Sequence, residues 1–163
     1  MSLDPSEFRI ACGHFATGVA IVTMRDGTGE NHGFTANSFT SVSLEPPLVL
    51  VCVEKTISSH SPMTETEGFV VNILTEQQEG LARRFATPDI DKFEHVTTEP
   101  GEYGAPRIPG CLAYLAAASH SRHDGGDHTI FIGEATGAEL GSGRPLIFYQ
   151  GMYGLPGNGA ATE

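Results

Sequence analysis

The first apolar pattern along the chain is helical. Asp4 and Pro5 are typical of a helix cap and a first helical position, and Glu7 can bond back to that cap. Apolar residues then recur at intervals of three and four positions, at Phe8, Ala11, Cys12 and Phe15. This spacing predicts an amphipathic helix near the start of the chain, which Gly18 ends.

Short apolar runs separated by turn residues follow, and they are typical of strands. We expect strands at residues 19–24, 48–54, 69–74 and 146–153, and two long arms around residues 124–127. The sequence Asp-Gly-Gly-Asp between those arms is the strongest hairpin signal in the chain. A second hairpin is expected at residues 25–29, with its return strand passing through Gly33. The run at 48–54 is almost wholly apolar, which predicts a strand covered on both faces.

A polar stretch precedes the strand at 48–54. Its hydroxyl and amide side chains are Thr35, Asn37, Ser38, Thr40, Ser41 and Ser43. Apolar residues are interspersed, and neither glycine nor proline occurs between Thr35 and Leu44, so we expect an extended chain here. One interpretation is a strand that presents a row of hydrogen-bond donors to a bound polar molecule. The alternative interpretation is a solvent-exposed loop that only connects two elements.

Two more short helices are predicted. Ser61 and Pro62 are typical of a cap and a first position, and residues 75–78 form a capping box that opens a helix ending before Pro88. Residues 97–110, rich in proline and glycine, are expected to be irregular. Six or seven strands joined mainly by hairpins indicate a mainly β (α+β) fold. A closed or nearly closed antiparallel barrel is favoured, because closure removes exposed edge strands.

Size and composition narrow the function. The chain is expected to form one domain over residues 1–163, with a loose tail at about 155–163. The net charge of −11, from 20 acidic and 9 basic residues, argues against nucleic acid and membranes as partners. No apolar run is long enough to cross a bilayer and no export signal begins the sequence, so we expect a cytoplasmic protein. Cys12, Cys52 and Cys111 lie among apolar residues, which predicts reduced core thiols.

Three kinds of site are argued against. No G-x-S-x-G motif supports a hydrolase. Gly27-Thr28-Gly29 lacks the third glycine and the following helix of a dinucleotide-binding loop, so it is interpreted as a turn. Three imidazoles that could converge on a metal lie on the two long arms, at His120, His123 and His128. The turn itself accounts for the neighbouring Asp124 and Asp127, and no metal is expected.

Anion binding is a stronger hypothesis. The segment Ser58-Ser59-His60-Ser61 lies just ahead of a predicted helix, where free backbone N–H groups and the helix dipole attract a phosphate. Taken alone, this segment is better interpreted as a helix cap. The donor-rich stretch leads through one more strand into the same segment. Together they could hold the polar edge of a flat heterocycle at one end and its phosphate at the other.

This combination resembles the flavin reductase family with an FMN-binding split β-barrel, the reductase components of two-component flavin monooxygenases. The matching blocks are GHFATGVAIVT, GFTANSFTSVSLEPPLVLVCV, FVVNILTEQQEGLARRFA with DKF, GDHTIFIGEA and PLIFYQGMYG. They occur in the family's order and span residues 8–154, and the block over residues 33–47 is highly specific. The chain departs from the family at Ala135, where a β-branched residue is usual. Residues 97–110 carry no clear family motif.

The resemblance implies roles for individual residues. Those implied to line the flavin ring are Thr35, Ala36, Asn37, Ser38, Ser41, Cys52 and Val53. Those implied to lie near the ribityl phosphate are Ser58, Ser59 and His60. Those implied to cover or neutralise the cofactor are Arg84, Phe85 and Lys92. His128 is implied to meet the nicotinamide, with Tyr149 and Tyr153 as weaker neighbours. Core or strand-face packing is the alternative for Phe85 and for both tyrosines.

The implied activity is that of an NAD(P)H:flavin oxidoreductase, which passes a hydride from the nicotinamide to FMN or FAD. The reduced flavin would serve a separate monooxygenase component. NADH is favoured over NADPH, because a 2′-phosphate needs an arginine cluster and only Arg122 lies near the long hairpin. The family's barrels pair, so a homodimer with each flavin near the subunit boundary is expected. The competing interpretation is a non-catalytic flavin- or heme-binding protein on the same barrel.

Overall fold

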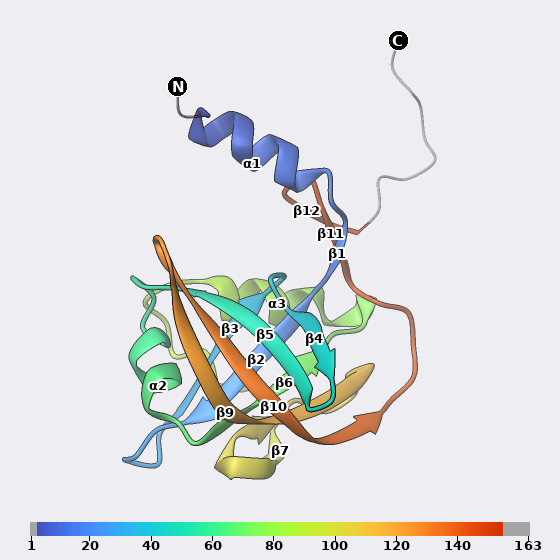
Figure 1. Cartoon of the computed structure of the whole chain (residues 1–163). Coiled ribbons are helices and arrows are strands. Elements are labelled where there is room, and N and C mark those ends of the chain that lie inside the picture. Colours follow the sequence, from blue (N-terminus) through green and yellow to red (C-terminus); the bar gives the residue numbers. More distant parts are fainter. Residues whose placement is uncertain (1–2, 155–163) are drawn as a thin grey trace.

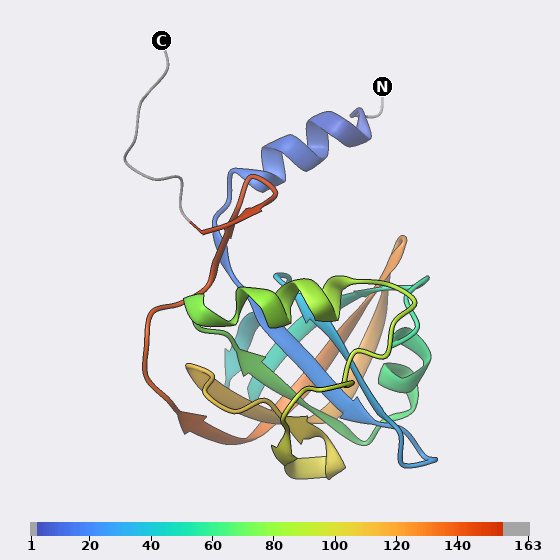
Figure 2. The same ribbon diagram turned by 180° about the vertical axis from the view of Figure 1, so that it is seen from behind.

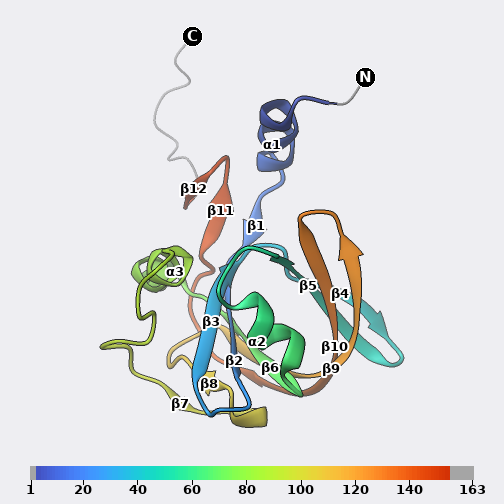
Figure 3. The same ribbon diagram turned by 90° about the vertical axis from the view of Figure 1, so that its left-hand side faces the viewer.

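Seven antiparallel strands form one sheet that curls into an incomplete barrel (Figure 1). The computed structural model describes residues 3–154. In spatial order the strands are β3 (Asn31–Ala36), β2 (Ala20–Arg25), β6 (Gly68–Ile73), β9 (Ala113–Gly125), β10 (His128–Leu140), β5 (Pro47–Glu54) and β4 (Thr40–Leu44). The end strands β3 and β4 lie on opposite sides of the curled sheet (Figure 3). The prediction of a mainly β, antiparallel fold with short helices is confirmed.

Side chains fill two cores, because successive residues of a strand point to opposite faces of the sheet. Within the barrel, Val22 of β2 packs in a cluster that includes Phe131. On the outer face of the same strand, Ile21 packs in a second cluster with Phe85 of helix α3 (Glu79–Ala86). Figure 2 shows α3 lying across this side of the sheet. Strand β2 is therefore buried on both faces.

Strand β5 differs from its prediction. Its inward side chains, Val49, Val51 and Val53, are 5%, 0% and 1% exposed. Its outward side chains, Leu48, Leu50 and Cys52, are only partly buried. The expectation of a strand covered on both faces is therefore wrong within this chain, since the outward side chains leave part of their apolar surface exposed to solvent.

The polar stretch is likewise not one strand. β3 ends at Ala36, and β4 begins only at Thr40 on the far side of the barrel's gap. Residues 37–39 form the connection between these two end strands. The donor side chains are therefore divided between two strands and a short loop.

The two internal helices begin close to their predicted positions. Helix α2 (His60–Glu65) is capped at Ser59 rather than Ser61, so Pro62 occupies the third helical position. A proline is tolerated there because the first N–H groups of a helix have no partner within the helix. The predicted capping box is confirmed: the Thr75 N–H donates to Oε1 of Gln78 over 3.0 Å. It opens the 3-10 turn η1 (Glu76–Gln78), which continues into α3.

The chain ends form an extension that stands apart from the barrel (Figure 1). Helix α1 (Pro5–Gly13) is followed by β1 (Thr17–Gly18), which pairs with β11 (Ile147–Tyr149). β11 turns at Gln150 and Gly151 into β12 (Met152–Tyr153), so the single strand predicted at 146–153 is instead a small hairpin. Helix α1 has no buried residue, and Cys12 is exposed rather than in the core.

Residues 97–110 are more regular than expected. β7 (Glu99–Pro100) pairs with β8 (Pro106–Arg107), and the 3-10 turn η2 (Glu102–Gly104) joins them. The buried side chain of Asn72 fixes this segment: its Oδ1 accepts from the N–H of Ile108 over 2.8 Å, and its amide donates to the Ile21 carbonyl over 2.9 Å.

Among the helices formed by residues 3–154, none is long and apolar enough to cross a membrane.

Candidate functional site

A polar cleft opens where the start of β3 meets the loop before α2 and the segment after α3. Its volume is about 470 Å³. The lining residues are Glu30, Asn31, His32, Gly33, Ser58, Ser59, Ile90, Asp91, Lys92 and Phe93. Of the predicted site residues, the structure therefore gathers Ser58, Ser59 and Lys92 here, from segments 58–59 and 90–93 that are distant in the sequence.

The carbonyl of Gly33 joins these segments at the cleft. It accepts a hydrogen bond from the Ser59 hydroxyl over 3.0 Å and another from Nζ of Lys92 over 3.2 Å. Ser59 is 2% exposed, whereas Ser58 is exposed at the cleft. Burial lowers the pKa of the Lys92 ammonium. A half-buried cation and a free hydroxyl therefore face the same hollow, and this donor set suits a phosphate.

Arg84 shapes the cleft from behind. Its guanidinium donates to the carbonyls of Lys92 over 2.9 Å and Asp91 over 2.6 Å, and it lies 3.7 Å from the Glu94 carboxylate. These bonds hold the segment that carries Lys92. Arg84 itself does not line the cleft.

Phe85 is in the core. Its side chain is 0% exposed, which favours the packing alternative, and its ring meets that of Phe93 edge to face at 5.0 Å. Phe93 is the ring that lines the cleft. Phe93 belongs to the DKF block, for which the sequence indicated no role at this position. It lies in a loop without regular structure, so no periodic pattern marks it as facing the cleft.

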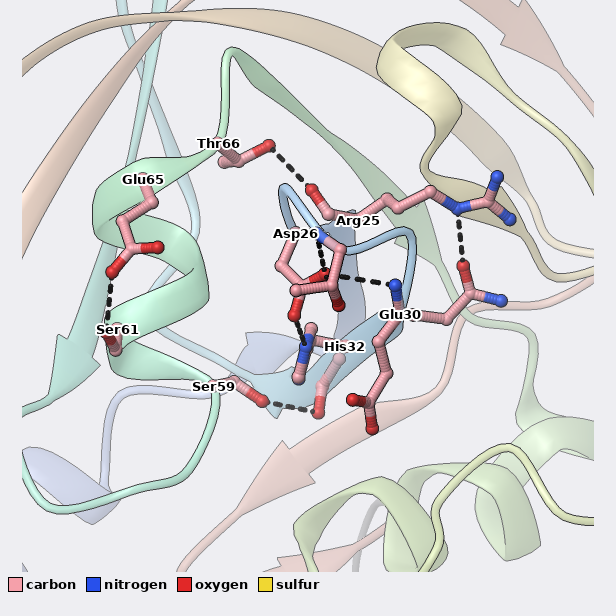
Figure 4. A network of polar contacts seen from close by, with 11 residues as sticks. Arg25, Asp26, Glu30, His32, Ser59, Ser61, Glu65 and Thr66 are labelled. Atoms are coloured by element: carbon pink, nitrogen blue, oxygen red, sulfur yellow. Dashed lines mark hydrogen bonds and ion pairs between the residues drawn. The ribbon is translucent and has the colours of Figure 1, made fainter.

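His32 was also missed. It lines the cleft, and Figure 4 shows its ring facing Asp26, with 2.8 Å between Nε2 and Oδ2. Asp26 also accepts from the Thr28 hydroxyl and from the N–H groups of Thr28 and Glu30. The bonds from Thr28 and then His32 hold the pKa of this carboxyl well below its usual range. The pattern is that of a tight β2–β3 turn, which confirms the predicted hairpin.

The donor-rich residues at the end of β3 and beyond it have different roles. The Thr35 hydroxyl donates to the Ala82 carbonyl over 2.7 Å and so ties β3 to α3. The Ser38 hydroxyl bonds the backbone of Cys52. Asn37 and Ser41 are exposed, whereas Ala36 is buried. Of the predicted ring-lining side chains in this stretch, only these two exposed ones are free to meet a ligand.

Two predicted ring neighbours lie on β5. Cys52 is partly buried, and desolvation raises the pKa of its thiol. The Val53 side chain is 1% exposed and belongs to the barrel core. Val53 can therefore meet a ligand only through its backbone.

The tip of the β9–β10 hairpin carries His128. Its Nδ1 lies 2.7 Å from Oδ1 of Asp127, and this bond lowers the pKa of the carboxyl. Next to it, the Thr129 hydroxyl meets Nε2 of His60 at 2.9 Å. His60 therefore faces the hairpin rather than the cleft. The hairpin tip and the loop before α2 thus lie side by side.

The other hairpin histidines do not join His128. His120 lies 3.9 Å from the Glu134 carboxylate, and His123 meets the Ser121 hydroxyl at 3.2 Å. Within residues 3–154, the one group of side chains with metal-ligand spacing is Asp26, Glu30 and His32. The bonds within the turn account for the carboxylate of Asp26.

Tyr149 and Tyr153 lie on the small C-terminal hairpin, away from the cleft. Tyr149 meets the His14 ring edge to face at 6.2 Å, and the Arg83 guanidinium lies 4.9 Å from the Tyr153 ring centre. Both contacts are those of strand-face packing, which was the alternative for these residues.

Comparison with known proteins identifies the fold and its family. The family model of the flavin reductase like domain matches residues 12–155. The reductase component of 4-nitrophenol 4-monooxygenase/4-nitrocatechol 2-monooxygenase from Rhodococcus opacus is 41% identical over 152 residues, which cover 93% of this chain and 81% of the relative. An NADH-dependent FAD reductase from Streptomyces globisporus is 44% identical over 153 residues, covering 91% and 83%.

A solved structure agrees with these sequence matches. The NADH:FAD oxidoreductase of Streptomyces globisporus, in complex with NAD and FAD fragments, superposes with a TM-score of 0.88 at 41% identity. The superposition covers 98% of this chain and 99% of that one. Fold, sequence and coverage agree along nearly the whole length, and the chain belongs to the flavin reductase like family.

Proposed function

We propose that this chain is an NADH-dependent flavin reductase that supplies reduced FAD or FMN to a separate flavin-dependent monooxygenase. When both are bound, the nicotinamide supplies a hydride and the flavin accepts it. The observation that carries the proposal is the side-by-side placement of the His128 hairpin and the loop that ends at the Lys92 cleft. The named activities of the relatives, an NADH-dependent FAD reductase among them, favour the same reaction.

The residues present fit a flavin. The cleft of about 470 Å³ joins a half-buried lysine to serine hydroxyls, which is the donor set for a ribityl phosphate. Ser58 and Lys92 would hold that phosphate. Ser59 would keep its bond to the Gly33 carbonyl, and Arg84 its bonds to the segment that carries Lys92. The exposed donors Asn37 and Ser41 would meet the polar edge of the ring.

We propose that the remaining predicted contacts with the flavin ring are made by backbone groups. Ala36, Ser38, Cys52 and Val53 have side chains that are buried or already bonded, so their N–H and carbonyl groups would line the ring. Thr35 acts by holding β3 to α3. This division explains why a stretch so rich in hydroxyls precedes a buried strand.

His128 is proposed to orient the nicotinamide. In the neutral imidazole, Nδ1–H donates to Asp127, which leaves Nε2 to accept a hydrogen bond. The carboxamide N–H of the nicotinamide is the matching donor. NADH suits this hairpin better than NADPH, because Arg122 already donates to the Thr64 carbonyl.

A homodimer in the cytoplasm is part of the proposal. Helix α1 presents the exposed apolar side chains of Phe8 at 59% and Ile10 at 64% exposure, and Phe15, just after the helix, is 78% exposed. On the edge strand β4, Leu44 is 90% exposed. Apolar surface of this kind supports a second copy as its cover. The free thiols of Cys12, Cys52 and Cys111 support a reducing compartment.

The decisive experiment mixes the purified protein with NADH and either FAD or FMN, and follows the nicotinamide absorbance band. Flavin-dependent oxidation of NADH, faster than without protein, is expected. A protein that binds flavin tightly and oxidises neither NADH nor NADPH would be a non-catalytic binding protein instead. Running the assay anaerobically, with flavin in excess, separates flavin reduction from reoxidation by oxygen.

A further inference from the structure

The tip of the β9–β10 hairpin has little packing of its own. All residues from 121 to 127 are exposed, and Figure 1 shows the tip standing clear of the barrel. The ladder between β5 and β10 reaches as far as the pair of Glu54 with His128, so the turn at residues 124–127 lies beyond it. The position of this turn, which orients the His128 side chain, therefore depends on contacts from other elements.

Lys55 supplies that contact from the end of β5. Its Nζ donates to Oδ1 of Asp124 over 2.5 Å and to the carbonyl of Gly126 over 2.6 Å. Its backbone N–H donates to the carbonyl of Asp127 over 3.0 Å. One residue thus bonds three residues of the turn, immediately before His128.

The pairing also favours the ionised form of its partner. The hydrogen bond from Lys55, together with its charge, lowers the pKa of the Asp124 carboxyl. The Lys55 and Asp124 side chains are 40% and 80% exposed, so the ion pair alone adds little to the stability of the fold. Three bonds to one turn nevertheless fix its position relative to β5.

A second bond, from the first residue of α2, supports the hairpin on the other side of His128. Nε2 of His60 meets the Thr129 hydroxyl at 2.9 Å, and the His60 ring lies edge to face with Phe131 at 5.8 Å. Lys55 and His60, at the two ends of the connection between β5 and α2, therefore contact the hairpin before and after His128.

We propose that Lys55 is a positioning residue for NADH: it clamps the hairpin turn so that His128 meets the nicotinamide. The inference rests on the proposed role of His128. The Lys55 side chain contributes through Asp124 and Gly126, and it touches neither cofactor itself. Its loss loosens the turn, while the backbone bond to Asp127 and the barrel stay in place.

The test compares Lys55→Met with Arg144→Met. Arg144 is an exposed cation that pairs with Glu76, and it lines neither the hairpin nor the cleft, so its loss changes the net charge by the same amount. Lys55→Met is expected to raise the KM for NADH, and the Kd for NAD⁺ measured by titration of the FAD-loaded protein, by about three- to tenfold. Flavin affinity and the unfolding midpoint should stay unchanged. Amide hydrogen exchange at residues 125–128 should quicken in the flavin-free protein.

Asp124→Asn separates a clamp from a direct contact. Removing the carboxylate weakens the clamp, so NAD⁺ should bind less tightly; if Lys55 instead met the dinucleotide phosphates, the freed ammonium would bind NAD⁺ more tightly. The effects of Lys55→Met and Asp124→Asn should be less than additive in the double variant. Lys55→Arg should restore most of the affinity.

The outcomes also separate this inference from the proposed function. Suppose that His128→Ala weakens NAD⁺ binding, while Lys55→Met and Arg144→Met bind NAD⁺ equally well. The proposed role of Lys55 is then wrong, and the proposed nicotinamide site at His128 is retained. If His128→Ala has no effect on NAD⁺ binding, the proposed site itself is wrong, and the clamp has no function to serve.

Discussion

The hydroxyl of Ser38 bonds both backbone groups of Cys52: it donates to the carbonyl over 3.0 Å and accepts from the N–H over 3.1 Å. Ser38 lies in the loop that follows the end strand β3, and Cys52 lies in the middle of β5. This pair of bonds therefore bridges the gap in the barrel where no strand ladder runs between β3 and β5 in the described part of the chain. Asn37, one position earlier, is exposed and free to meet a ligand.

Ser38→Ala and Asn37→Leu should consequently have different effects. Ser38→Ala leaves two partly buried backbone groups without a partner and should lower the free energy of unfolding by about 1–3 kcal/mol. Asn37→Leu should keep that stability but lose about 1–3 kcal/mol of flavin affinity, because polar atoms of the ring lose a donor. Urea unfolding and flavin fluorescence titration measure the two quantities. A Ser38→Ala variant of normal stability would show that water replaces the hydroxyl.

His128→Ala should impair use of NADH. Without the imidazole the nicotinamide loses its orienting acceptor, and misplacement by about 1 Å can cost on the order of a hundredfold in rate. We expect lower kcat and a higher KM for NADH, with the flavin Kd unchanged. Asp127→Asn should show a milder change in the same direction, because it weakens the bond that orients the ring. Wild-type kcat/KM for NADH in His128→Ala would return this residue to a solvated turn.

Lys92 should make flavin binding depend on pH. Burial lowers the pKa of its ammonium, so the positive charge is lost at a lower pH than for an exposed lysine. In the natural protein, phosphate affinity should therefore fall with rising pH before the usual lysine pKa of about 10.4 is reached, and in Lys92→Arg it should stay level. Lys92→Gln should bind flavin weakly throughout.

Unfolding does not account for such a loss. A lysine whose pKa is lowered by folding releases its proton first in the folded state, so the unfolded chain binds more protons in that window. The contribution of Lys92 to stability therefore rises with pH above its lowered pKa. Equal pH profiles for the natural protein and Lys92→Arg would remove Lys92 from the phosphate site.

The three cysteines should react with a thiol reagent at different rates. Cys12 on α1 is exposed, whereas Cys111 is 2% exposed and burial raises its pKa to about 11. At pH 8 the thiolate fraction of such a group is only about one part in a thousand. One fast thiol per chain is expected, lost in Cys12→Ser. Denaturant should expose all three. Fast labelling of Cys111 in the folded protein would contradict the burial described.

The homodimer can be tested by sedimentation at micromolar concentration. If a second copy covers the apolar side chains of α1 and β4, Phe8→Ser with Phe15→Ser should shift the protein towards monomer. Arg9→Ser, on the same helix but without loss of apolar surface, is the matched control. A natural protein that sediments as a monomer would contradict the expectation directly.

Local patterns were sufficient for most elements. The capping box at Thr75, the Asp-Gly-Gly-Asp hairpin and the strand at 69–74 depend on neighbours in the sequence, and the structure has all three. The C-terminal hairpin was missed because its turn needs a left-handed Gln150, which no residue preference indicates. The one-domain prediction for residues 1–163 stays a prediction, and its tail at 155–163 lies outside the described residues.

The site was harder to predict, because side-chain partners come from distant segments. Residue type alone suggested that Thr35, Ser38 and Arg84 would face a ligand, yet each bonds a backbone carbonyl of the fold. Conversely, His32 and Phe93 line the cleft through loop geometry that has no sequence pattern. The resemblance to the family pointed to the sequence blocks that surround the cleft. Only the three-dimensional contacts distinguish the residues that hold the fold together from those that are free to bind a ligand.

Gly33 shows how such a division affects the interpretation of sequence alignments. A methyl group at this position would lie 2.9 Å from the ring of Phe85, on the side where α3 packs, while its carbonyl serves Ser59 and Lys92. Substitution would therefore push a buried aromatic ring and its helix outward, whatever the protein binds. A glycine shared by related sequences at this point is explained by packing. Its invariance would carry no information about the ligand, in contrast to the identity of the exposed Asn37 four positions later.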